Sequence, residues 1–169
     1  MHILQHERMR PMHTPIYTDA DLLAITRQQR KRWLLIALPC LLLLIPLVLG
    51  LHLRVEWLTS VSTVIIGVIL IAGYDLAIKP LHCYARHLDN CLHGRTRECE
   101  LPFIRLSENI DLVDGVQFRQ LLCSDTDGKG RPYERLFYFD VLATFPEVNE
   151  GDLLHVVHHD LAVADVYPA

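Results

Sequence analysis

Residues 33–53 read WLLIALPCLLLLIPLVLGLHL, and residues 57–78 read WLTSVSTVIIGVILIAGYDLAI. The first run has no charged side chain, and the second has one, Asp75, near its end. A helix rises about 1.5 Å per residue, so the first run reaches about 31 Å, which matches a hydrocarbon core of roughly 30 Å. Both runs begin with Trp, a residue that favours the membrane interface. The two runs predict a pair of transmembrane helices.

The composition excludes several other classes of protein. The 169 residues are 51% hydrophobic and 21% charged, with a mean hydropathy of +0.22. This is too apolar for a disordered chain and too uneven for an ordinary soluble globule. Two buried core helices are the alternative, but a domain this small could not surround them. A cleaved signal peptide is also disfavoured, because the first run is too long and begins only at residue 33.

Charge predicts how the two spans are oriented. Three residues, 54–56, separate the runs, which suits a tight antiparallel helical hairpin. Eight basic residues lie close to the outer ends of the runs, and one, Arg54, lies between them. The eight are Arg27, Arg30, Lys31 and Arg32 before the first run, and Lys79, Arg86, Arg95 and Arg97 after the second. The positive-inside rule therefore predicts a multi-pass protein of a bacterial inner (plasma) membrane with both termini in the cytoplasm.

Four residues inside the spans have structural roles that can be predicted. Pro39 and Pro46 each remove a backbone donor and are expected to kink the first helix, although such breaks can also frame a transport site. Thr63 and Gly67 form a small-xxx-small pair that permits close backbone approach. We expect this pair to pack on the first span or on a second copy of the chain.

Asp75 is a candidate functional residue, because an ionisable side chain within an apolar run is costly. It lies at the cytoplasmic margin, however, and Lys79 follows four residues later, where an ion pair can form on a helix. We favour a solvated or paired interfacial carboxylate over a proton relay, since the membrane runs contain no second carboxylate.

The rest of the chain divides around this hairpin. Residues 1–17 show no apolar periodicity and are predicted to be mobile, whereas Thr18 begins a helix that runs from Asp19 to Arg32 toward the membrane. After the spans, apolar residues at helical spacing predict an amphipathic helix that stops at Gly94. The predicted domains are an N-terminal cytoplasmic segment with a juxtamembrane helix (1–32), a two-span hairpin (33–79), an amphipathic connecting helix (80–96) and a cytoplasmic β domain (97–169).

Residues 97–169 have the two-residue period of β-strands. Segments rich in Val, Phe, Tyr and Leu alternate with turn signals such as Asp114-Gly115. The predicted strands are Glu98–Leu106, Gly115–Cys123, Tyr133–Leu142, Asp152–His158 and Leu161–Tyr167. Five short antiparallel strands predict a small all-β domain, a five-stranded barrel of the OB or SH3-like kind.

A membrane hairpin followed by such a barrel resembles the NfeD-like membrane proteins and various small bacterial membrane proteins. The resemblance concerns the layout of residues 33–169, with Val113–Val116 and Glu150–Asp152 as turn phrases common in barrels. It implies no catalytic residue for this chain.

Binding of nucleic acid is disfavoured by charge. Residues 94–169 contain 14 acidic and 7 basic side chains, a net charge of −7. Binding to phosphates needs a basic groove, with aromatic side chains for stacking. The aromatic side chains of residues 133–139 are therefore expected to form core.

Metal binding is the sharpest chemical alternative. Cys83, His87 and Cys91 follow one another at four-residue spacing, so a helix would place them on one stripe, and Cys99 lies close by in sequence. Thiolate and imidazole would suit zinc or copper. However, no Cys-x2-Cys or His-x3-His pair occurs, and Cys91 lies on the apolar face, where a reduced thiol serves as a small hydrophobe.

These observations predict a non-enzymatic interaction or accessory module anchored in the lipid bilayer, with no cofactor. Its expected partner is a membrane protein or a second copy of the chain. Two alternatives remain open, a metal or redox sensor that uses Cys83, His87 and Cys91, and a small subunit of a membrane transport complex.

Overall fold

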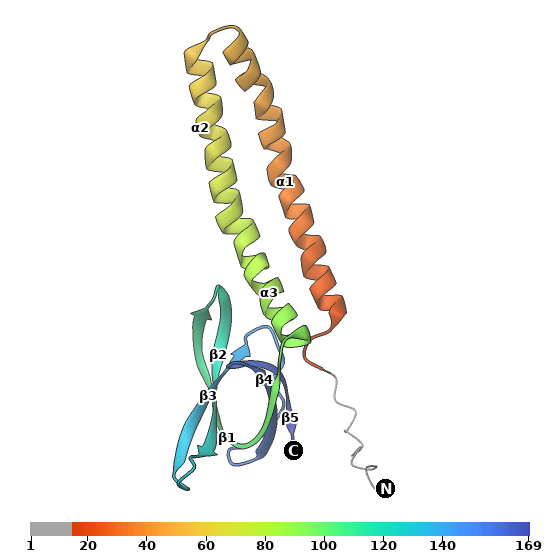
Figure 1. Ribbon diagram of the computed structural model, residues 1–169, viewed down its shortest axis with the longest axis vertical. Coiled ribbons are helices and arrows are strands. Elements are labelled where there is room, and N and C mark those ends of the chain that lie inside the picture. Colours follow the sequence, from red (N-terminus) through yellow and green to blue (C-terminus); the bar gives the residue numbers. More distant parts are fainter. Residues whose placement is uncertain (1–14) are drawn as a thin grey trace. The chain divides into compact units, whose positions relative to one another are not determined.

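A computed structural model describes residues 15–169. It contains two compact units (Figure 1). The helical unit holds residues 19–90 and 112–117, and the barrel unit holds residues 15–18, 91–111 and 118–169. The helical elements are α1 (Asp19–His52), α2 (Glu56–Gly73), the π-helix η1 (Tyr74–Ile78) and α3 (Lys79–His93). The strands are β1 (Arg97–Val113), β2 (Val116–Thr126), β3 (Pro132–Asp140), β4 (Leu153–His159) and β5 (Ala162–Pro168).

Two long antiparallel helices dominate the helical unit, as the apolar runs predict (Figure 1). The first apolar run and the predicted helix before it form one continuous helix, α1. The turn that ends α1 is a Schellman motif: Arg54 is left-handed with φ 53°, and the Val55 N–H donates to the Gly50 carbonyl at 2.9 Å. This motif closes the hairpin in three residues, 53–55, one position before the predicted loop.

Small residues hold α1 and α2 together. A Cβ on Gly73 would lie 2.9 Å from the side chain of Ile36, and one on Gly50 would lie 2.8 Å from Thr59 Oγ1. Ser62 is buried, with 4% of its surface exposed. These positions form the seam of the helical hairpin, because they let the two backbones approach closely.

The predicted small pair lies elsewhere. A Cβ on Gly67 would meet no atom within 4 Å, and Thr63 bonds back to the Thr59 carbonyl in its own helix at 2.9 Å. The expectation that Gly67 packs on the first span is therefore wrong, because the helix is rotated so that this glycine faces away. Contact of this face with a second copy of the chain stays a prediction.

Prolines interrupt the helical ladder differently in the two spans. α1 continues through Pro39 and Pro46, and the kink expected there stays a prediction. In the second span the helix widens into η1, where the Lys79 N–H donates to the carbonyl of Tyr74, five residues back. Pro80 follows at once and has no N–H to donate to the carbonyl four residues earlier. The π-turn thus adapts the helix to the proline, and α3 then continues to His93 as the predicted amphipathic helix.

The five strands close into a barrel in the order β1-β2-β3-β5-β4 (Figure 1). All five lie where the sequence pattern predicts them, although β1 is much longer than expected because it continues to Val113. The prediction that all strands are antiparallel is wrong, since β3 pairs with β5 in parallel at Tyr138 and Ala162. A parallel pair arises because β4 returns antiparallel to β1 and then turns directly into β5.

The barrel interior is filled by alternate residues of the strands. Phe137 and Leu121, which are paired across β2 and β3, are both completely buried. The core consists of Leu101, Phe103, Leu121, Cys123, Phe137, Phe139, Leu154, Val156, Val163 and Val166. Burial of these side chains is the main term that stabilises the barrel.

One end of the barrel is covered by aromatic side chains. Phe145, from the connection between β3 and β4, packs its ring 5.5 Å from that of Phe103 and 5.1 Å from that of Phe139. Tyr17 is also buried, and its hydroxyl donates to the Asp140 carboxylate at 3.2 Å. The prediction of a mobile segment over 1–17 is therefore wrong at Tyr17, while residues 1–14 lie outside the described part of the chain.

Candidate functional site

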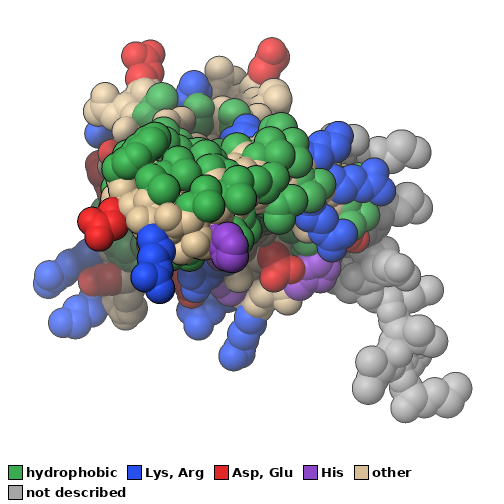
Figure 2. Space-filling view, turned by 90° about the horizontal axis from the view of Figure 1, so that it is seen from above, with side chains coloured by type: hydrophobic (Ala, Val, Ile, Leu, Met, Phe, Trp, Pro, Cys, Tyr) green, Lys and Arg blue, Asp and Glu red, His purple; other side chains and the backbone are tan. Residues whose placement is uncertain are grey.

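The most extensive chemical feature is the apolar surface of the helical hairpin. Two helical stretches, Asp19–His52 and Glu56–His93, are long and apolar enough to cross a membrane, and only 11% of the most apolar window of each is buried. Leu35 and Ile71, for example, are 71% and 68% exposed. Figure 2, which looks onto the structure from above, shows these hydrophobic side chains gathered into a continuous area. Such a surface requires a non-aqueous environment or a partner.

A belt of interfacial residues lies at the end of this surface. Trp33 of α1 and Tyr74 of η1 place their rings 6.4 Å apart, and Arg32 donates to the carbonyl of Ala77 at 3.2 Å. Aromatic rings and snorkelling basic side chains are typical of the boundary between lipid and water. These contacts join the two helices close to residues 74–79.

Asp75 belongs to the same belt. Its carboxylate lies 3.7 Å from the Lys79 ammonium, which confirms the predicted pair. The two side chains are 56% and 61% exposed, so their mutual attraction is weak. This geometry gives no support to a proton relay at Asp75.

The predicted metal ligands are in separate environments. Cys83 lies against Gly115, where a Cβ would approach its Sγ to 2.8 Å, and His87 and Cys91 are buried on α3. Cys99 lies on β1, and its Sγ is 3.6 Å from the Val156 carbonyl. Within residues 15–169, no three His, Cys, Asp or Glu side chains gather as metal ligands. Burial also raises the pKa of Cys91 to about 12, which disfavours the thiolate that a metal needs.

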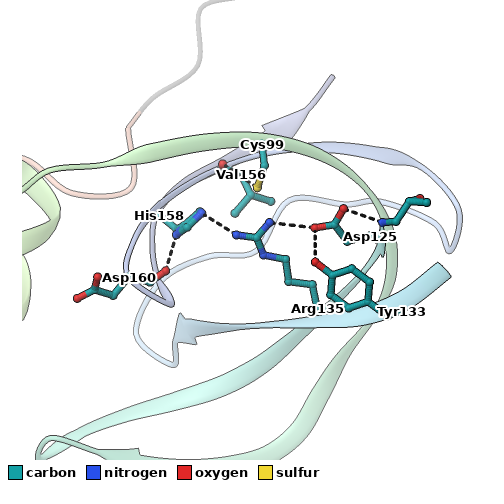
Figure 3. Close-up of polar contacts among 8 residues, drawn as sticks. Cys99, Asp125, Tyr133, Arg135, Val156, His158 and Asp160 are labelled. Carbon is teal, nitrogen blue, oxygen red and sulfur yellow. Dashed lines mark hydrogen bonds and ion pairs between the residues drawn. The ribbon is translucent and has the colours of Figure 1, made fainter. Parts of the chain in front are cut away.

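A polar cluster that the sequence did not reveal closes the other end of the barrel (Figure 3). Arg135 Nη1 donates to the Asp125 carboxylate at 3.0 Å, and Arg135 Nη2 lies 3.5 Å from His158 Nε2. The guanidinium also lies 5.1 Å from the centre of the Phe137 ring. The Tyr133 hydroxyl donates to the same carboxylate at 2.9 Å. The cluster therefore joins β2, β3 and β4 above the core.

Hydrogen bonds fix the charges in this cluster. The pKa of Asp125 lies below its usual value, first because the Thr126 N–H donates to the carboxylate, and then because Tyr133 and Arg135 do. Burial lowers the pKa of His158. Nδ1 of His158 is 2.5 Å from the Asp160 carbonyl, so this nitrogen carries the proton and Nε2 accepts from Arg135. A neutral histidine and an ionised carboxylate thus satisfy the guanidinium.

Two thiols lie near this cluster and are not activated by it. Burial raises the pKa of Cys123 to about 11, with a further contribution from Cys99, and burial likewise raises the pKa of Cys99. A reactive thiol needs a lowered pKa. The cluster consequently has the character of a structural plug rather than of a nucleophilic centre.

The pattern of alternate residues contained part of the signal for this cluster. Tyr133 and Arg135 share a strand face with Phe137, and Asp125 shares one with Cys123. Their meeting depends on the β2–β3 register, which pairs Asp125 with Tyr133, and on the closure that brings in β4. Sequence reasoning had no means of fixing either.

An open groove of about 420 Å³ lies at the aromatic end of the barrel. Its walls come from the segment before α1 and from the connection between β3 and β4. The lining residues are Pro15, Ile16, Leu142, Ala143, Thr144, Phe145, Pro146 and Val166. The groove carries no ionisable side chain, so it offers shape and apolar contact but no acid–base chemistry.

Comparison of the chain with models of protein families, with curated proteins and with solved structures gave no match.

Proposed function

We propose that this chain is a membrane-anchored accessory module. The helical hairpin α1–α2 crosses the bilayer, both ends of the chain are cytoplasmic, and the barrel binds a partner protein at the inner face without catalysing a reaction. The observation that carries this proposal is the exposure of nearly all apolar side chains of α1 and α2. Lipid would cover this surface without any further protein.

The ends of the hairpin support this orientation. The belt of Trp33, Tyr74 and Arg32 suits the cytoplasmic boundary, where basic residues accumulate. The eight basic residues near this end, against Arg54 alone at the tip, favour cytoplasmic termini. The short turn at residues 53–55 leaves no room for an external domain.

We assign the barrel to the OB type. β1 pairs with β2 and β4, and β5 lies between β3 and β4, which follows the path of a Greek-key barrel. The parallel contact of β3 with β5 supports this assignment over an SH3-like barrel. A hairpin of two spans with a cytoplasmic OB-type barrel is the layout for which the NfeD-like proteins of bacterial membranes are the comparison.

Charge and chemistry define the proposed partner. The net charge of −7 over residues 94–169 repels anionic headgroups and attracts basic protein surfaces. The thiols at the polar end are held in their protonated form, and the groove at the other end has no ionisable lining. These properties suit binding of a basic surface of a neighbouring membrane protein.

The anchor is tested by moving a charge onto the proposed lipid-facing surface. Leu42→Arg lies near the middle of α1, at a side chain that is 58% exposed. An arginine at the centre of a span disfavours insertion by about 3 kcal/mol. We expect the variant to lose its resistance to alkaline carbonate extraction. Leu142→Arg is the matched control, because Leu142 is 77% exposed but belongs to the barrel unit. Equal extraction of both variants would refute the anchor.

The partner is tested by charge reversal in native membranes. Glu147→Lys with Glu150→Lys reverses two exposed charges of the connection between β3 and β4, and Glu56→Lys makes the same change at the tip of the helical hairpin. We expect a specific crosslinked product of the full chain to disappear in the first variant and to persist in the second. The absence of any such product, or its persistence in both variants, would overturn the proposed partner.

A further inference from the structure

We infer that the tip of the β1–β2 hairpin, residues 110–117 (the β-tip), contacts the lipid headgroups at the cytoplasmic face of the membrane. This inference rests on the proposed function, because it requires α1 and α2 to span the bilayer. It assigns a lipid-binding role to a part of the β domain.

The first step is the place of the β-tip on the helical unit. Residues 112–117 belong to the same compact unit as the helices. Gly115 has φ +81°, and a Cβ at this position would lie 2.8 Å from Cys83 Sγ and 3.2 Å from Cys83 Cβ. The turn of the β-tip therefore packs directly on α3, in a contact that only glycine permits.

The second step is the depth of this contact. The belt of Trp33 and Tyr74 marks the boundary of the hydrocarbon core, and Ile78 is the last residue of the apolar run. Cys83 follows five residues later, about 7.5 Å further along the helix axis at about 1.5 Å per residue. The interfacial layer on each side of the hydrocarbon core is about 5–8 Å thick. The contact between Gly115 and Cys83 consequently lies within the headgroup layer.

The third step is the chemistry that the β-tip presents. Ile110 and Leu112 alternate on one face of β1, and they are 54% and 71% exposed. Asp111, between them, points to the opposite face, where its carboxylate accepts a hydrogen bond from Gln120 at 2.5 Å. One face of the β-tip is thus apolar and the other polar. Leu76, one turn before Pro80 on the helix, is 79% exposed and continues the apolar surface of the helical unit.

Quenching of tryptophan fluorescence by brominated lipids tests this inference on the full chain. The chain contains two tryptophans, Trp33 and Trp57, at the ends of the spans. Replacing both with Phe gives a background into which Leu112→Trp or Leu142→Trp is introduced separately. Each protein is reconstituted in phosphatidylcholine–phosphatidylglycerol vesicles with and without brominated acyl chains. Both substituted leucines are exposed, so neither change disturbs a packed core.

We expect brominated lipid to quench Leu112→Trp by about half and to shift its emission to shorter wavelength, because an interfacial indole lies close to the acyl chains. The Leu142→Trp fluorescence should instead be quenched by aqueous iodide. Equal responses of the two variants, or quenching of Leu112→Trp by iodide alone, would overturn the inference. The native protein separates this failure from that of the anchor, since quenching of Trp33 and Trp57 by brominated lipid reports the spans independently.

Discussion

The same kinds of side chain occupy opposite environments in the two units of this protein. Leu34 of α1 is 70% exposed, whereas Leu121 of β2 is completely buried. The barrel buries large aromatic and branched residues in its own interior, while the helical unit buries small residues in its seam and leaves the large ones outside. The difference shows that the barrel supplies its own apolar environment, whereas the helical hairpin requires one from its surroundings.

The largest expected effect breaks the barrel core. Phe137→Ala should reduce the free energy of unfolding of the barrel by about 3–5 kcal/mol, because it leaves a large cavity in a closed interior. Leu41→Ala, at a side chain that is 63% exposed on α1, should have little effect on the same transition. Urea unfolding of the full chain in detergent, followed by near-UV circular dichroism, measures both. Equal losses would show that the two units do not differ as described.

The next effect sharpens the description of the helical seam. Gly73→Val introduces methyl groups where a Cβ alone already lies 2.9 Å from Ile36, so it should destabilise the hairpin by about 1–3 kcal/mol. Gly67→Val, on the open face, is the control and should be nearly neutral. Thermal unfolding in detergent measures both variants, and adding Ile36→Ala should partly rescue Gly73→Val. A larger loss for Gly67→Val would contradict the assigned seam.

A smaller effect concerns pH and the polar end of the barrel. The pKa of His158 is lowered in the folded state, so the unfolded chain binds a proton first as the pH falls below about 6.5. Stability should therefore be fully present above that pH and decrease as the pH falls toward the folded-state pKa. His158→Gln should flatten this dependence, whereas His159→Gln, in the same strand, should not. Urea midpoints between pH 8 and pH 5, conventional limits for this titration, provide the test.

The smallest effect is expected at the membrane belt. Asp75→Asn removes an ion pair whose two side chains are more than half exposed, so the free energy of unfolding should change by no more than about 0.5 kcal/mol. Thermal unfolding in detergent measures it. A loss as large as that of Gly73→Val would mean that Asp75 has a buried or functional role that the ion pair with Lys79 does not explain.

The sequence was sufficient for the elements and insufficient for their mutual rotation. Hydrophobic runs and alternation predicted both spans and all five strands, because apolar side chains must leave water in either case. The small pair Thr63 and Gly67 was placed on the wrong face, since a spacing motif does not indicate which neighbour it meets. The seam at Gly50 and Gly73 depends on the left-handed turn at Arg54, a residue that does not signal such a conformation.

The polar end of the barrel shows the same limit for strands. Asp125, Arg135 and His158 are far apart in the chain, and each could have been a solvated surface residue. Only the register of β2 with β3 and the closure through β4 bring them together. Register and closure are tertiary properties, which local sequence patterns specify weakly.

The most direct test of the central claim is the sidedness of the helical hairpin in intact spheroplasts. Glu56→Cys places a thiol at the exposed tip, and Lys129→Cys places one in an exposed loop of the barrel. The native chain, with five cysteines of its own, is the control. If the hairpin spans the membrane with cytoplasmic ends, a membrane-impermeant maleimide labels Glu56→Cys in intact cells and labels Lys129→Cys only after permeabilisation. Labelling of Lys129→Cys in intact cells, or protection of Glu56→Cys, would contradict this topology.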